Sequence, residues 1–147
     1  KIRPHIGFGT IEFRMLDVQR SLINTHMFIA LLQALTRTAV LEKNKDILIE
    51  NLSLEILNDG LWKASRFDFD AKLTDSGDNE IVTMKRFIKK MIDYCFDSLK
   101  YFNNESVIDD VNNILLNGTE GDKQLKIYSD SGIDSLKSFL IKDVKYN

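Results

Sequence analysis

Hydrophobic and polar residues alternate over a short run near the start of the chain. The alternation covers Thr10–Met15, where β-branched and aromatic residues recur at every second position. A period of two is typical of a half-buried β-strand. One face of this strand would carry Ile11, Phe13 and Met15, and the other Thr10, Glu12 and Arg14. Because a single strand cannot form a sheet, we expect it to pair with another copy of the chain or to leave an edge unpaired.

Beyond residue 17 the apolar residues recur every three or four positions, which predicts amphipathic α-helices. Asp17 or Ser21 would cap the first helix, and Ser106 and Ser131 each precede an aspartate by three residues, as in a capping box. We expect helices over Val18–Lys43, Ile47–Asn58, Ile81–Phe102, Ser106–Leu116, Gly121–Tyr128 and Ile133–Val144. Apolar and polar residues also alternate from residue 52 to residue 56, so a strand is an alternative for the second helix.

Polar and glycine-containing stretches separate the predicted helices. Asn44–Asp46 and Thr74–Asn79 are typical of a turn and a loop, and Asp59–Gly60 would end the second helix. Trp62–Phe69 is aromatic and basic, and we interpret it as a packed loop that covers an edge of the core. The sequence therefore predicts a single α+β domain over residues 1–147. One or two N-terminal β-strands within residues 1–17 would precede a mostly helical region over residues 18–147.

The composition is ordinary for a soluble domain with one hydrophobic core. Of the 147 residues, 44% are hydrophobic and 29% are charged, and the net charge of −2 gives no electrostatic footprint for nucleic acid. No apolar run approaches the about 18 residues of a membrane span. The only cysteine, Cys95, excludes an intramolecular disulfide and falls on the apolar stripe of a predicted helix, which favours a buried, inert thiol. We expect a cytoplasmic protein with neither a nucleic-acid nor a membrane partner.

A carboxylate and a guanidinium share the polar face of the predicted strand. Glu12 and Arg14 would stand about 6.6 Å apart along it. Such a pair can hold a cation and an anion side by side, which metal–nucleotide chemistry requires. The commoner interpretation of a Glu-x-Arg pair is a solvated face with a weak surface ion pair. The spacing alone leaves both interpretations open.

Three stretches of the chain share motifs with one family of enzymes. The first reads Arg3-Pro4-His5, then Gly9-Thr10-Ile11-Glu12-Phe13-Arg14, then Asp17; the second is Trp62-Lys63-Ala64-Ser65-Arg66-Phe67-Asp68; the third is Gly118-Thr119-Glu120-Gly121-Asp122-Lys123-Gln124. In this order they resemble motifs in the C-terminal half of the carboxylate–amine ligases. These are the glutamate–cysteine ligase type 2 relatives of glutamine synthetase. The first motif is the most specific and the third the least.

The chain departs from that family's pattern at several positions. Ile6 replaces the second proline of the first motif, and Asp68 stands where the second motif has glycine. The asparagine that opens the second motif is also absent. These departures leave open a ligase homologue that has lost its activity.

The resemblance implies an ATP-dependent ligase with a glutamine synthetase-like catalytic domain, of which this chain would be the C-terminal part. ATP would phosphorylate a carboxylate, usually the γ-carboxylate of glutamate, and an amine such as that of cysteine would then attack the acyl phosphate. By this resemblance Glu12 would bind Mg²⁺ or Mn²⁺, and Arg14 would be catalytic and clamp phosphate. Arg3 and Arg66 would bind substrate or phosphate.

Further expectations concern the parent protein and its assembly. The chain lacks an initiator methionine and begins close to a strand, so we expect a fragment of a longer ligase that is inactive alone. An apolar face left exposed would favour a homo-oligomer. The alternative from a different class is a non-catalytic helical interaction module whose strand adds to the sheet of a partner.

Overall fold

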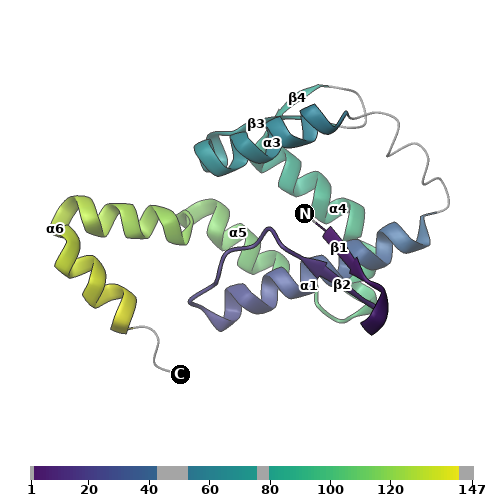
Figure 1. The fold of residues 1–147 in the computed structure, drawn as a ribbon, viewed down its shortest axis with the longest axis horizontal. Helices are drawn as coiled ribbons and strands as arrows, with labels where there is room; N and C mark the ends of the chain where they lie inside the picture. Colours follow the sequence, from purple (N-terminus) through teal and green to yellow (C-terminus); the bar gives the residue numbers. More distant parts are fainter. Residues whose placement is uncertain (1, 43–52, 76–79, 143–147) are drawn as a thin grey trace.

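The computed structural model describes residues 2–42, 53–75 and 80–142, and it is an α+β structure dominated by helices (Figure 1). The elements in chain order are β1 (Ile2–His5), β2 (Thr10–Phe13), α1 (Leu22–Leu41), α3 (Leu54–Phe67), β3 (Lys72–Thr74), β4 (Ile81–Thr83), α4 (Met84–Tyr101), α5 (Val107–Asn117) and α6 (Glu120–Lys142). The predicted fold class is confirmed. Among the described helices, none combines the length and the apolar character that crossing a membrane requires.

The two N-terminal strands form an antiparallel hairpin. The register pairs Ile2 with Phe13, Arg3 with Glu12, Pro4 with Ile11 and His5 with Thr10. Gly9 closes the connection with a φ of 60°, a left-handed conformation that glycine adopts without steric cost. Residues 2–5 of the same chain are therefore the partner of this strand, and among the described residues its other edge carries no strand, as expected of an unpaired edge. Pairing with another copy stays a prediction. The strand also ends at Phe13 and not at Met15.

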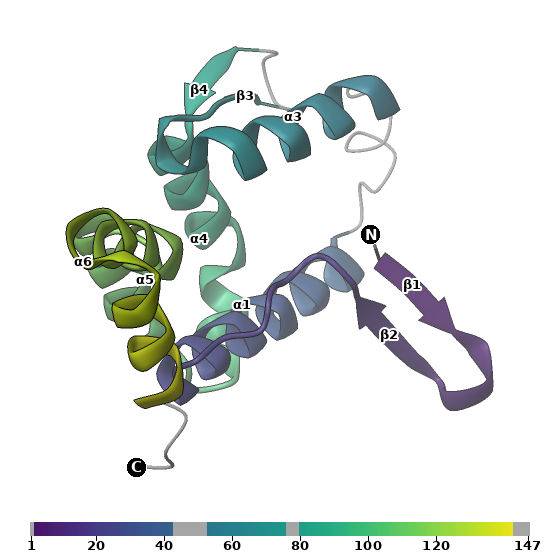
Figure 2. The same cartoon turned by 60° about the vertical axis from the view of Figure 1, so that its left-hand side comes forward.

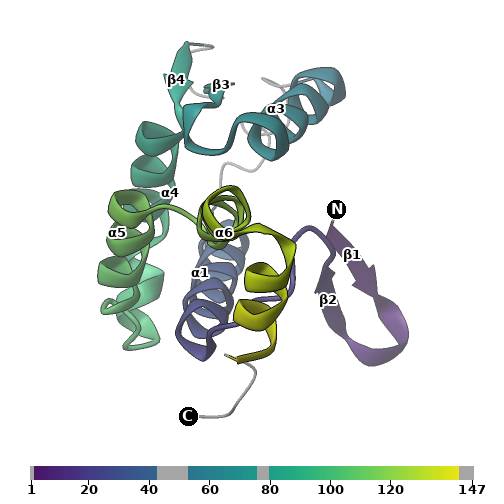
Figure 3. The same cartoon turned by 90° about the vertical axis from the view of Figure 1, so that its left-hand side faces the viewer.

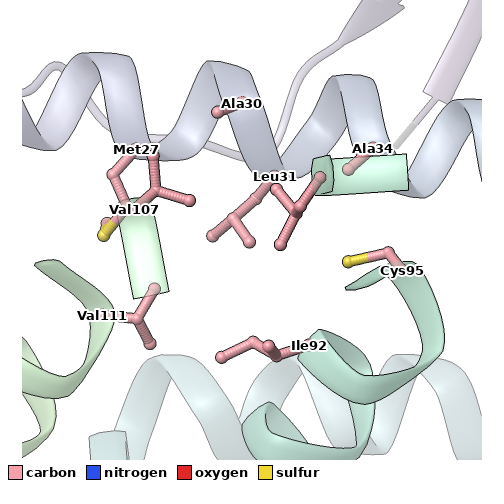
Figure 4. Close-up of a cluster of buried hydrophobic side chains, with 9 residues drawn as sticks. Met27, Ala30, Leu31, Ala34, Ile92, Cys95, Val107 and Val111 are labelled. Atoms are coloured by element: carbon pink, nitrogen blue, oxygen red, sulfur yellow. The ribbon is translucent and has the colours of Figure 1, made fainter. Parts of the chain in front are cut away.

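The hydrophobic core lies where α1 packs against α4 and α5 (Figure 4). Its buried side chains are Met27, Ala30, Leu31, Ala34, Ile92, Cys95, Leu99, Val107 and Val111. Cys95 is fully buried there, and burial raises the pKa of its thiol. This surrounding supports the predicted inert thiol, because only the thiolate is a strong nucleophile.

A smaller unit packs at the start of α4 (Figure 2). It consists of α3 and the β3–β4 hairpin, in which Leu73 and Val82 are buried cross-strand partners. A Cβ at Gly60 of α3 would lie 3.8 Å from Leu73 Cδ2, so the Gly60 side of α3 faces β3. Lys90 of α4 forms an ion pair with the buried Asp75 at the end of β3, which ties the unit to the core.

The C-terminal helix bends and is held at both ends by one arginine. Gly132 has a φ of 76° inside α6, so this helix consists of two segments, which agrees with the two helices predicted on either side of Ser131. Arg20 pairs with Glu120 in the first segment and donates to the backbone oxygen of Phe139 in the second, at 2.8 Å. Its guanidinium also lies 4.0 Å from the centre of the Phe139 ring. The second segment consequently lies beside the start of α1 (Figure 3).

The largest error in the predicted elements concerns α3. Asp59–Gly60 does not end a helix, since α3 continues to Phe67, and most of the predicted Trp62–Phe69 loop is therefore helical. The physical reason is that α3 packs on β3 along the side that carries Gly60, and this tertiary packing outweighs the low helix propensity of glycine. The helix ends only at Asp68. The predicted turn Asn44–Asp46 lies outside the described residues, as does the start of the helix predicted from Ile47.

Two helix starts also differ from the prediction. Helix α1 begins at Leu22, and the Ser21 hydroxyl accepts a hydrogen bond from the Asn24 N–H, so Ser21 and not Asp17 is its cap. Residues 81–83 belong to β4, and α4 begins at Met84 after the Thr83 cap. A three-residue strand next to a long amphipathic helix has too few positions to reveal its own period.

Candidate functional site

The alternation in the N-terminal hairpin gives it a polar face and an apolar face. The register places Ile2, Pro4, Ile11 and Phe13 on the apolar face, and Arg3, His5, Thr10 and Glu12 on the polar face. Ile11 and Phe13 line one side of a groove of about 610 Å³, and α1 together with Phe102 lines the other side. Since the apolar face is turned toward α1, the polar face is turned away from the helices.

Glu12 stands between two arginines on the polar face. Its Oε2 lies 3.2 Å from Nε of Arg3 on the neighbouring strand, and its Oε1 lies 3.3 Å from Nε of Arg14. Arg3 and Glu12 are direct cross-strand partners, so the hairpin register itself holds this pair together. The structure thus brings together three of the four predicted site residues. We call Arg3, Glu12 and Arg14 the hairpin cluster.

The hairpin cluster is open to solvent and carries one excess positive charge. The side chains of Arg3, Glu12 and Arg14 are 57%, 45% and 56% exposed. Exposed ion pairs contribute about 0–1 kcal/mol each, so the cluster adds little to the stability of the fold. Both arginines approach Glu12 most closely through Nε, and neither forms an ion pair with another described residue. Their terminal N–H groups form the planar fork that binds phosphate and carboxylate oxygens.

His5 lies on the same face beside the cluster. Its ring stacks on Phe8, with the ring centres 4.5 Å apart and the planes inclined at 30°. The Nδ1 atom is enclosed and has no hydrogen-bond partner among the described residues. The ring thus contacts Phe8 of the turn, whereas the partners of Glu12 are Arg3 and Arg14, so His5 is a neighbour of the cluster and no part of it.

Glu12 is chemically suited to a hard divalent cation, but it is a single ligand. Within the described ranges, no three histidine, cysteine, aspartate or glutamate side chains come close enough together to hold a metal ion. Mg²⁺ commonly binds one or two carboxylates and completes its shell with water and the phosphates of a substrate. The donor set present here therefore fits a metal that arrives with a nucleotide better than a metal held by protein groups alone.

Arg66 is not part of the hairpin cluster. It is exposed in the last turn of α3, and α3 packs against β3 and the following single turn, η2 (Asp68–Asp70). Figure 2 shows the α3–β3 end of the molecule well separated from the N-terminal hairpin. The structure therefore does not bring Arg66 to Glu12 and Arg14.

The second and third sequence motifs meet at the junction between α3 and α6. The Thr119 hydroxyl lies 3.0 Å from Oδ2 of Asp68 and 2.9 Å from Oδ2 of Asp122, and its single proton serves one carboxylate at a time. Asp68 has a φ of 48° and a ψ of −126°, a conformation that glycine adopts most easily. This contact was missed from the sequence, because the two partners are far apart along the chain.

Sequence reasoning found Arg3 only through a resemblance, although a local signal was present. Residues 2–5 alternate between apolar and polar side chains in the same way as residues 10–13. The four residues between the runs include two glycines, which is typical of a hairpin with a longer connection. Aligning the two runs would have predicted Arg3 opposite Glu12.

Comparison with known families agrees with the motifs and their order. The sequence model of glutamate–cysteine ligase family 2 matches residues 1–138. The chain therefore belongs to glutamate–cysteine ligase family 2.

The relatives are bacterial and considerably longer. A candidate glutamate–cysteine ligase 2 of Sorangium cellulosum is 28% identical over 128 residues, which cover 87% of this chain and 34% of that protein. Its counterpart in Solibacter usitatus is 25% identical over 146 residues, covering 99% of this chain and 38% of that protein. A further relative, from Chloroflexus aggregans, is 27% identical over 150 residues, which cover 97% of this chain and 38% of that protein. The chain thus spans about a third of the length of these relatives.

Proposed function

We propose that this chain supplies the hairpin cluster to the nucleotide site of an ATP-dependent carboxylate–amine ligase, with an amino acid carboxylate and an amine as substrates. The observation that carries the proposal is the cross-strand register, which sets a carboxylate between two guanidinium groups on one exposed face. Family membership and the order of the motifs support the reaction class.

The reaction needs positive charge where the phosphoryl group is transferred. The γ-phosphoryl group of ATP would pass to a carboxylate oxygen of the first substrate, giving an acyl phosphate and ADP. The amine would then attack the carbonyl carbon, and inorganic phosphate would leave as the amide forms. In both steps negative charge lies on phosphoryl oxygens, and fixed cations near those oxygens lower the barrier.

The arginines and the glutamate of the hairpin cluster would have different roles in this reaction. Arg3 and Arg14 would direct their terminal N–H groups to phosphoryl or carboxylate oxygens, while Glu12 would provide a hard oxygen ligand. Mg²⁺ or Mn²⁺, when bound with the nucleotide, would neutralise polyphosphate charge. Until then Glu12 keeps both guanidinium groups in place by ion pairs that are weak enough to exchange.

The direct test is turnover in the complete protein that carries residues 1–147, followed as phosphate release with MgATP, glutamate and cysteine. We expect Glu12→Gln and Arg14→Gln each to lower kcat by about 100-fold or more, since each removes a charge that acts on the phosphoryl group. Glu105→Gln and Arg86→Gln are matched controls at exposed positions outside the cluster and should stay within about twofold. Unchanged turnover in Glu12→Gln would refute the proposal.

A further inference from the structure

The turn of the N-terminal hairpin presents an exposed pair of aromatic rings. Phe8 is 78% exposed, and its ring centre lies 4.5 Å from that of His5. Figure 2 shows this turn at the end of the hairpin that points away from the helices. A single exposed apolar side chain is common on protein surfaces and needs no explanation. Two stacked rings beside a cluster of charged groups form a more specific surface, and we call His5 and Phe8 the aromatic platform.

The aromatic platform continues the polar face of the hairpin beyond the hairpin cluster. His5 shares this face with Arg3 and lies two residues, or about 6.6 Å, further along β1. Phe8 stacks on His5 from the turn, with the two planes inclined at 30°. The order along the hairpin is therefore the guanidinium groups, then the imidazole, then the phenyl ring. A ligand that lies along this face can contact the cluster and the platform together.

Two glycines flank Phe8 and leave its ring uncovered. A Cβ at Gly9 would meet nothing within 4 Å apart from its neighbours in the chain, so this side of the turn is open. A Cβ at Gly7 would lie 3.7 Å from Cε1 of His5, which places Gly7 against the imidazole. The inner ring of the platform is thus packed on the turn, and the outer ring is available to a ligand.

The chemistry along the hairpin matches the two ends of a nucleoside triphosphate. Phosphate oxygens suit the guanidinium groups of Arg3 and Arg14, whereas a purine is a flat π-system that stacks on aromatic side chains. The ribose lies between the base and the phosphates, so groups that bind these two ends have to stand apart along one surface. The cluster and the platform have this arrangement.

We propose that the aromatic platform is the base subsite of the nucleotide site, in which the adenine of ATP stacks on Phe8 while the phosphates lie at the hairpin cluster. This inference rests on the proposed function, because it assigns a second part of the same site. Phe8 contacts the base, and His5 is a positioning residue that supports the phenyl ring. Every base has a π-face, so the platform adds affinity for nucleotides and does not select adenine over guanine.

The test compares ATP with inorganic tripolyphosphate, which has the phosphates without the base. Calorimetry with Mn²⁺ on the complete protein that carries residues 1–147 measures both ligands, and circular dichroism checks the fold of each variant. We expect Phe8→Ala to weaken ATP binding by about tenfold and tripolyphosphate binding by less than about twofold, because only ATP loses a stacking contact. Phe8→Tyr should bind ATP like the wild type, since it keeps an aromatic face. Tyr128→Ala is the matched control, because Tyr128 is 54% exposed in α6.

A double-mutant cycle tests the role of His5. His5→Ala should weaken ATP binding in the wild-type background and cause no further loss in the Phe8→Ala background, because His5 acts through the phenyl ring. His5→Phe should restore the affinity, since a phenyl ring can stack in the same place. Additive losses from the two alanine substitutions would contradict this positioning role.

The same measurements separate the base subsite from the proposed ligase activity. Glu12→Gln should weaken the binding of ATP and of tripolyphosphate alike, because the metal ligand serves the phosphates. Unchanged ATP binding in Phe8→Ala, or an equal loss of both ligands, would overturn the base subsite and leave the role of the hairpin cluster standing. A complete protein that binds neither ligand would refute the nucleotide site as a whole, and the base subsite with it.

Discussion

At the scale of single residues, the hairpin cluster adds little to stability and keeps its charged groups accessible to a ligand. Glu12 is half-exposed and shares its two oxygens between Arg3 and Arg14, so none of the three groups is locked by burial. Charged groups that are held in register yet remain in contact with water can exchange partners when a ligand arrives. This property distinguishes the cluster from the ion pair that Lys90 forms with the buried Asp75, which fastens β3 to α4.

Asp68 shows how a departure from the family pattern is accommodated. It stands where the resembling family has glycine, and its positive φ keeps the backbone in a conformation suited to glycine. The carboxylate offsets part of the strain, since it lies within hydrogen-bond distance of Thr119. Asp68 therefore occupies a backbone conformation that glycine adopts more easily.

This account predicts an unusual order of stabilities at position 68. Asp68→Gly should be more stable than Asp68→Ala by about 1 kcal/mol, because both variants lack the hydrogen bond and only alanine keeps the steric cost of the positive φ. Urea unfolding of the two variants measures the difference. Equal stabilities, or a more stable alanine variant, would show that the backbone at this position is not strained.

At the scale of elements, the hydrophobic period predicted the long helices. It missed the short strands and the helix end that depends on tertiary contacts. The apolar stripes of α1, α4 and α5 repeat over several turns, and these helices were placed to within a few residues. Each strand of the β3–β4 hairpin has only three residues, too few for a visible alternation. Gly60 was interpreted as a helix end, because its packing against Leu73 cannot be inferred from the local sequence.

The sequence pattern predicted one part of the candidate site, and the other part depends on the tertiary structure. Glu12 and Arg14 were placed on one face by alternation alone, since the period of a strand fixes which side chains share a side. Their pairing with Arg3 needed the hairpin register, and the separation of Arg66 from them needed the arrangement of α3 in space.

Arg20 is the element-scale contact with the clearest consequence. It joins the start of α1 to both segments of α6 and is only 15% exposed. Arg20→Gln should lower the free energy of unfolding by about 1–2 kcal/mol, because a partly buried Glu120 loses its partner and the second segment loses its attachment. Hydrogen exchange should accelerate after Gly132 in particular. Arg86→Gln, which removes a looser and exposed ion pair, should change stability by less than about 0.5 kcal/mol.

At the scale of the whole molecule, the N-terminal hairpin and α3 are separate elements with different surface chemistry. The N-terminal hairpin presents a polar face with one excess positive charge, and α3 presents an apolar stripe with charges of opposite sign at its two ends. The proposed ligand site therefore involves the N-terminal hairpin and not α3. Variants in α3 should therefore leave ligand binding at the hairpin cluster intact.

The measurement that tests the central claim most directly is Mn²⁺-dependent ATP binding to the 147-residue chain by calorimetry, beside Glu12→Gln. The account predicts that ATP binds only with Mn²⁺ present and that Glu12→Gln weakens this binding by about tenfold or more, because the substitution removes the carboxylate ligand. Binding that is indifferent to Mn²⁺ and to the substitution would contradict the account. So would a wild-type chain that binds no nucleotide, since the hairpin cluster would then not be a working part of the site.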